Sequence, residues 1–140
     1  MFVDASAIIA ILTDEADGEI LAAALEAGRV RPITSVIAVW EATVGVFRKK
    51  SLQIDRAEAL VREFLDCAGV QILPVSEPDV PLALKAYEQF GRHRTPETNR
   101  NRALNLADCF HYACAKRHLT SILYKDAGFD LTDVPNALSQ

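Results

Sequence analysis

Residues 1–12 have the sequence MFVDASAIIAIL, in which Asp4 is the only charged residue. The first four residues predict a short buried strand, and the segment from Ala5 to Leu12 predicts a helix. A strand followed at once by a helix is typical of α/β folds. The carboxylate at the junction has two explanations: it caps the helix, or it is held in a pocket by a charged partner or a metal.

Two more acids are isolated in apolar sequence in the same way. Glu41 is the only charge in ITSVIAVWEATVGVF (33–47), and Asp108 is the only formal charge in ALNLADCFHYACA (103–115). Both segments predict helices, and apolar residues cover so much of the Glu41 helix that it is expected to be largely buried. No nearby Lys or Arg supports a structural ion pair for these acids. Together, the three carboxylates predict one acidic pocket that holds a divalent cation.

Short predicted strands alternate with predicted helices along the rest of the chain. The strands are expected at 1–4, 30–34, 70–75 and 120–124, and the helices at 5–12, 14–27, 35–49, 55–68, 77–90 and 105–117. This alternation predicts an α/β fold with a mainly parallel sheet, and the tail allows a short edge strand near Val134. Sites in such folds lie beyond the carboxyl ends of the strands, where Asp4 and the pair Lys125-Asp126 are located.

The size and charge of the chain narrow the functional classes. A length of 140 residues is typical of one domain, so we expect a single domain over residues 1–140. The net charge of −4 argues against binding nucleic acid through bulk positive charge, but an acidic pocket still allows a nuclease. The apolar runs are too short to span a membrane, and the N-terminus lacks the basic region of a signal peptide. We therefore expect a cytoplasmic protein without a membrane partner.

An all-carboxylate pocket suits Mg²⁺ or Mn²⁺, which prefer oxygen ligands. Such ions polarise phosphoryl oxygens and generate hydroxide from water, which is the chemistry of a phosphodiester hydrolase. In this interpretation Asp4 and Asp108 bind metal directly, and Glu41 completes the shell or orients the water. His111, on the same helix face as Asp108, either reaches a carboxylate or substrate or is a hydrogen-bonded residue at the edge of the core.

A basic loop, RHRTPETNRNR (92–102), has four arginines and a single acid. It either grips a phosphate backbone beside the pocket or is a solvated loop.

Four segments of the chain resemble the VapC branch of the PIN-domain family. MFVDASA (1–7) resembles the family's opening, and SVIAVWEA (35–42) resembles its second acidic motif. LNLADCFHYACAKRH (104–118) resembles the motif LNxGDCFAYALAK, and ILYKDAGFDLTDV (122–134) resembles the closing segment LLFKGxDFxxTD. The segments occur in the family's order and span essentially the whole chain.

This resemblance implies a three-layer α/β/α PIN-like fold and a Mg²⁺- or Mn²⁺-dependent endoribonuclease. It also implies the toxin of a VapBC-type toxin–antitoxin pair, which cleaves RNA and inhibits translation. The implied partners are the RNA substrate and a cognate VapB-like antitoxin. The implied assembly is a homodimer, with a heterotetramer or larger complex formed with the antitoxin. By motif, Asp4, Glu41 and Asp108 are the first three catalytic and metal-binding acids.

The fourth acid departs from the family pattern. The family has Asp directly before the Phe of the closing segment, whereas this chain has Gly128 before Phe129. Asp126 stands two residues before Gly128 and directly after a predicted strand, so it is the predicted fourth catalytic and metal-binding acid. Asp130, or a site with three acids, remains an alternative. Asp133, which matches the Asp of the family's Thr-Asp pair, is expected to be structural.

Two other functions remain open at this point. A non-catalytic PIN-like module that only binds a partner is one, because the closing motif is altered. A receiver-like phosphate-handling domain is the other, with Lys125 near the strand ends. The third predicted strand, VQILPV (70–75), ends without the phosphoacceptor Asp that a receiver needs, which argues against it.

Overall fold

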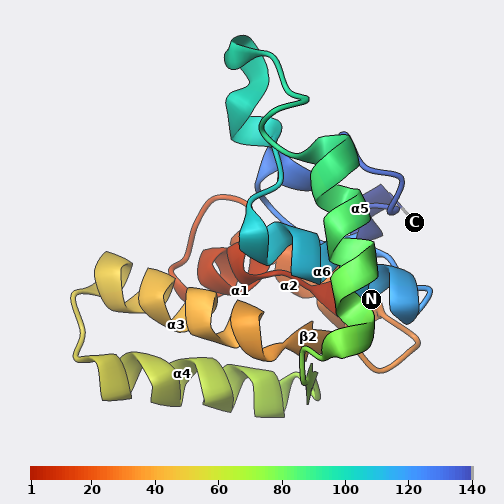
Figure 1. The fold of residues 1–140 in the computed structure, drawn as a ribbon. Helices are drawn as coiled ribbons and strands as arrows, with labels where there is room; N and C mark the ends of the chain where they lie inside the picture. The colour runs from red at the N-terminus through yellow and green to blue at the C-terminus, as the bar shows by residue number, and fades with distance from the viewer. Residues whose placement is uncertain (140) are drawn as a thin grey trace.

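The structure, a computed structural model, describes residues 1–139 and has a central parallel sheet (Figure 1). The strands occur in the order β3-β2-β1-β4, and every pairing between them is parallel. Phe2 pairs with Ile33 on one side and Ile122 on the other, which places β1 inside the sheet. The strands are β1 (Phe2–Val3), β2 (Ile33–Ser35), β3 (Gln71–Leu73) and β4 (Ile122–Leu123).

Helices flank the sheet and complete a three-layer α/β/α arrangement, as the sequence predicts. Helix α1 packs against α2 and α3, α3 packs against α4, and α5 packs against α6. Figure 1 shows α3 and α4 side by side, with α5 beside α6. The helices are α1 (Ala5–Leu12), α2 (Gly18–Ala27), α3 (Val36–Lys50), α4 (Ile54–Cys67), α5 (Val80–Phe90) and α6 (Leu106–Arg117). The short 3-10 helices are η1 (Glu77–Asp79), η2 (Glu97–Arg102), η3 (Ala127–Phe129) and η4 (Ala137–Ser139).

Local capping fixes where the helices of the site begin. The Ser35 hydroxyl accepts a hydrogen bond from the Ala38 backbone at 3.1 Å and starts α3, as predicted. Three basic residues in the last turn of α3 suit the negative end of its helix dipole. Helix α2 begins later than predicted, because Asp14 has a left-handed φ of 53° that no helix accommodates.

The predicted edge strand near Val134 is absent from the described residues. The chain there makes only an isolated bridge between Ile122 and Asn136, in which the Ile122 amide donates to the Pro135 carbonyl at 3.0 Å. Pro135 has no amide hydrogen to extend the ladder. The C-terminal segment therefore contacts the β4 edge without adding a strand.

Helix α3 is less buried than its composition predicts. Its inner face buries Ala38, Ala42 and Val46, whereas Val36 and Trp40 are 50% and 67% exposed. The expectation of a largely buried helix is wrong, because α1 and α4 cover only part of its circumference. No described helix is long and apolar enough to cross a membrane.

Candidate active site

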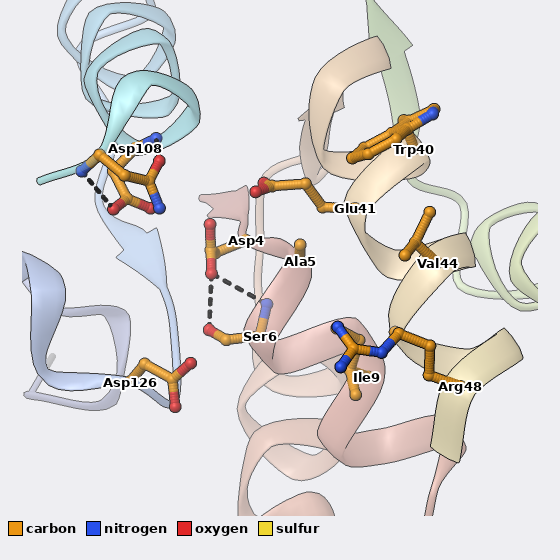
Figure 2. A pocket seen from close by; sticks show the side chains of 12 residues that line it. Asp4, Ala5, Ser6, Ile9, Trp40, Glu41, Val44, Arg48, Asp108 and Asp126 are labelled. Carbon is orange, nitrogen blue, oxygen red and sulfur yellow. Dashed lines mark hydrogen bonds between the residues drawn. The ribbon is translucent and has the colours of Figure 1, made fainter. Parts of the chain in front are cut away.

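Four carboxylates line one pocket of about 290 Å³ above the sheet (Figure 2). Asp4 comes from the end of β1, Glu41 from α3, and Asp108 from the first turn of α6. Asp126 comes from the segment after β4. The structure therefore brings together all four acids that the sequence singles out, at the carboxyl ends of the parallel strands.

Asp4 is both a helix cap and a pocket residue, so the two explanations offered by the sequence hold together. Its Oδ2 accepts hydrogen bonds from the Ser6 amide at 2.9 Å and the Ser6 hydroxyl at 2.5 Å. Its Oδ1 lies 2.8 Å from His111 Nδ1. Burial opposes ionisation of Asp4, but the His111 and Ser6 contacts outweigh it and hold its pKa below the ordinary value.

Ser6 joins the ends of two strands. Its hydroxyl donates to Asp4 and accepts a hydrogen bond from the Lys125 backbone at 3.0 Å. Lys125 directly precedes Asp126 on the segment after β4. Ser6 thus ties the position of Asp126 to that of Asp4, a link that no local sequence pattern encodes.

Asp108 is held by a capping box at the start of α6. Its Oδ2 accepts from the Asn105 amide at 2.9 Å, while the Asn105 side chain accepts from the Asp108 amide at 3.0 Å. Burial raises the pKa of Asp108, and repulsion from Asp4 and Asp126 adds to that effect. The capping box thus fixes the position of the Asp108 carboxylate, while burial and the neighbouring acids disfavour its ionised form.

Glu41 projects from α3 toward the same cluster, with a side chain that is 29% exposed. Burial raises its pKa, and the neighbouring charges of Asp4 and Asp108 add to the rise, against attraction from His111. Like charges crowded in a partly buried pocket are stabilised by a bound cation.

The donor atoms fit a divalent cation. One oxygen of Asp4 lies within 4.8 Å of one oxygen of Asp108, and a nitrogen of His111, which is engaged with Asp4, lies within the same distance of both. Asp4, Glu41, Asp108 and Asp126 all present carboxylate oxygens to the pocket, and hard divalent cations prefer such ligands. The residues present therefore fit Mg²⁺ or Mn²⁺.

The side chain of His111 is fully buried beneath the carboxylates. It therefore reaches pocket carboxylates, as one of the two sequence-based explanations holds, and it is not placed to contact substrate. Besides its contact with Asp4, its Nε2 lies 3.6 Å from Glu41 Oε2 and has no hydrogen-bond partner. Phe2 packs against the imidazole, with ring centroids 5.3 Å apart. His111 thus contacts two pocket acids and has no direct access to solvent.

The acids of the closing segment separate in space. Asp126 lines the pocket, whereas Asp130 binds Arg102 at 3.0 Å and the Tyr124 hydroxyl at 3.0 Å. Asp133 accepts hydrogen bonds from Tyr112 and Lys116 and joins the C-terminal segment to α6. The geometry thus favours Asp126 over Asp130 and gives Asp133 structural contacts.

The sequence reasoning does not identify several residues that line the pocket, among them Trp40, Arg48 and Asn105. Arg48 follows Glu41 by seven residues, a spacing that returns to the same face of a helix, and this spacing could have identified it. Figure 2 shows Arg48 and Trp40 on α3, on either side of Val44. Arg48 supplies a positive charge at the rim of an otherwise acidic pocket.

The basic loop does not line this pocket. Arg102 pairs with Asp130, Arg100 pairs with Glu97, and Arg94 donates to the Glu88 carbonyl. In Figure 1 the segment around η2 projects from the body of the molecule. These contacts favour the solvated-loop interpretation over a grip beside the pocket.

The metal-free protein is expected to lose thermal stability as pH rises from 4.5, the ordinary pKa of Glu41, to above 6.5, the ordinary pKa of His111. Folding raises the pKa of Glu41 and Asp108 through burial. It also raises the pKa of His111, because its contacts with Asp4 outweigh burial. The folded state therefore binds protons more tightly than the unfolded chain and is favoured at the lower pH. Asp4, with a lowered pKa, loses its contribution only below its ordinary value of 3.8.

Melting temperatures in EDTA, measured by circular dichroism across this pH range, test this expectation. Glu41→Gln removes one of the titrating groups, so its melting temperature should depend less steeply on pH. If the melting temperature changed equally with pH in wild type and in Glu41→Gln, Glu41 would not be one of the groups that cause the pH dependence.

Comparisons with known proteins agree with the geometry. The PIN domain family model matches residues 1–135. A ribonuclease VapC from Mycolicibacterium smegmatis is 35% identical over 139 residues, covering 96% of this chain and 97% of the relative. Ribonuclease VapC28 of Mycobacterium tuberculosis is 35% identical over 140 residues, covering 100% of this chain and 99% of the relative.

The fold also resembles a solved structure. The crystal structure of Mycobacterium tuberculosis VapC20, a toxin described as cleaving the sarcin–ricin loop, has a TM-score of 0.68. The match covers 96% of this chain and 95% of that chain, at 19% sequence identity. At this identity the likeness supports the architecture.

Proposed function

Because this chain belongs to the PIN-domain family and resembles its VapC ribonucleases along its whole length, we propose that it is an endoribonuclease toxin. It hydrolyses RNA phosphodiester bonds and thereby inhibits translation. The observation that carries this proposal is the convergence of Asp4, Glu41, Asp108 and Asp126 in one pocket. Membership of the PIN family makes the receiver-like alternative wrong.

Each pocket residue has a proposed role. Asp4 and Asp108 hold Mg²⁺ or Mn²⁺, while Glu41 and Asp126 complete the shell or orient water. The bound ion would polarise the scissile phosphate and lower the pKa of attacking water. Arg48, at the pocket rim, binds a phosphate of the RNA backbone. Ser6 and Asn105 keep the carboxylates of Asp4 and Asp108 in place through their hydrogen bonds.

Cleavage of labelled RNA by purified protein tests this function. Cleavage is expected with Mg²⁺ or Mn²⁺, and none in EDTA. Cleavage that persists after complete removal of divalent ions would contradict the metal role. Binding of a partner without cleavage under any metal condition would instead favour the non-catalytic alternative.

Asp126→Asn is expected to weaken Mn²⁺ binding about tenfold and to slow cleavage by a similar factor. The reason is the position of Asp126 in the pocket, where its charge acts on Asp108. Asp130→Asn is the matched control, because Asp130 contacts Arg102 and Tyr124 instead. Calorimetric Mn²⁺ titration of both variants decides the assignment. A larger loss in Asp130→Asn, or no loss in either, would reject Asp126 as the fourth acid.

Gly128→Asp is the opposite experiment, because it adds a carboxylate near the pocket and is expected to raise the affinity for Mn²⁺. A Cβ at this position would lie 3.9 Å from Asp108 Oδ2 and 4.0 Å from Leu104 Cδ2, both ordinary contacts. The substitution therefore places a carboxylate beside the pocket without a clash, and tighter Mn²⁺ binding than in wild type is expected. Weaker binding would show that an acid at this position cannot join the site.

The proposed partners are the RNA substrate and a VapB-like antitoxin, which the VapC naming of the relatives supports. Exposed Val36, Trp40 and Phe47 on α3 give a protein partner an apolar surface. We further propose a homodimer that forms a heterotetramer or larger complex with the antitoxin, in the cytoplasm. The match of the family model to residues 1–135 supports a single PIN domain.

A further inference from the structure

His111 is the buried residue whose contacts the proposed chemistry leaves unexplained. Its side chain has no exposed surface, yet it lies between a carboxylate at the end of β1 and another on α3. The acidic motif singles out Asp108, three residues before His111, and leaves the role of His111 itself unassigned.

The hydrogen-bonding groups around the ring define what each nitrogen does. An ionised carboxylate only accepts hydrogen bonds, so Nδ1 donates its proton to Asp4 Oδ1 across 2.8 Å. Nε2 faces Glu41 Oε2 at 3.6 Å, beyond hydrogen-bond distance, and no other described group satisfies it. In the protonated imidazole, which the surrounding carboxylates favour, both ring nitrogens are donors, so the unpartnered Nε2–H favours approach of the Glu41 carboxylate.

Packing makes the imidazole a rigid support. Phe2 lies against the ring, and α6 holds its backbone among buried residues on either side. Ser6 fixes the other oxygen of Asp4, so the His111 contact leaves that carboxylate with both oxygens engaged and one orientation. Glu41, by contrast, is partly exposed, and His111 Nε2 is the one buried polar atom found beside it without a partner in residues 1–139.

We propose that His111 is a positioning residue, which holds Asp4 by a hydrogen bond and draws Glu41 toward the same point. It thereby sets the separation of two carboxylates that come from different layers of the fold. This inference rests on the proposed function in so far as these carboxylates bind metal. Partners that orient metal ligands typically contribute 10- to 100-fold to metal affinity.

Substitutions that keep or remove single contacts test the role. His111→Leu removes both nitrogens while retaining much of the volume, and is expected to weaken Mn²⁺ binding about 10- to 100-fold. His111→Asn keeps a donor close to the Nδ1 position, and is expected to recover part of the affinity. Tyr112→Phe is the control, because it deletes a hydrogen bond of the adjacent residue to Asp133, outside the pocket. Calorimetry with Mn²⁺ alone gives the affinities.

Wild-type affinity in His111→Leu, or an equal loss in Tyr112→Phe, would overturn the proposal. The latter result would trace the effect to general packing of α6. Recovery in His111→Asn distinguishes positioning of Asp4 from simple filling of space.

The contact between His111 and Glu41 can also be tested without metal and without RNA cleavage, through the stability of the protein. Glu41→Gln is made in wild type and in His111→Leu, and the four melting temperatures are compared in EDTA. If Nε2 attracts Glu41, removing the Glu41 charge should raise the melting temperature more in the His111→Leu background. Equal shifts in both backgrounds would reject the contact, whether or not the protein cleaves RNA. Conversely, absence of cleavage by wild type with this coupling intact would reject only the proposed function.

Discussion

Asp4→Asn and Asp108→Asn are each expected to lower the rate of RNA cleavage by at least about 100-fold while the protein stays folded. Both substitutions remove a negative charge from the centre of the acidic pocket without changing side-chain size. Asn is as good a helix cap as Asp, so the start of α1 should persist in Asp4→Asn. The loss therefore reports on metal binding and reaction, and not on unfolding.

Cleavage of labelled RNA in saturating Mg²⁺ measures the effect, and circular dichroism confirms the fold of each variant. Asp66→Asn is the control, because it removes one exposed carboxylate from α4, which does not line the pocket. Activity within a few fold of wild type in Asp4→Asn or Asp108→Asn would reject the pocket as the reaction centre. A comparable loss in Asp66→Asn would trace the effect to net charge.

Asp79→Ala is expected to have the largest effect on stability, about 2–4 kcal/mol. Asp79 is 3% exposed and accepts hydrogen bonds from Arg117 Nη1 at 2.6 Å and the Ser76 amide at 2.7 Å. These contacts fasten the start of α5 to the end of α6. The Arg117 side chain is 36% exposed and regains water when its partner is lost, which keeps the cost below that of a fully buried pair.

Urea unfolding followed by circular dichroism gives the change in free energy of unfolding. Asp79→Asn should lose less, because its amide oxygen still accepts from Ser76. Asp66→Ala, an exposed acid on α4, should stay within about 0.5 kcal/mol of wild type. A small loss in Asp79→Ala would mean that α5 and α6 are held chiefly by apolar packing.

Local patterns gave much of the architecture. The junction at Asp4 and the Ser35 cap depend on a few adjacent residues, so sequence alone places β1, α1 and the start of α3. The start of α2 was misplaced because the left-handed backbone at Asp14 leaves no mark in hydrophobic periodicity. The exposure of Trp40 was missed for another reason: burial depends on which helices lie alongside, and composition does not name them.

The sequence by itself predicted the parallel α/β layout and singled out three candidate acids, because each of them is isolated among apolar residues. It narrowed the fourth to neighbouring positions, since both Asp126 and Asp130 follow the same strand. Only the tertiary structure separated them, by turning one into the pocket and the other toward Arg102. Only it joined His111 to Asp4, across 107 residues of chain, because that contact depends on the packing of α6 beside β1. Local chemistry thus selected the acids, and packing between distant segments decided how they are held.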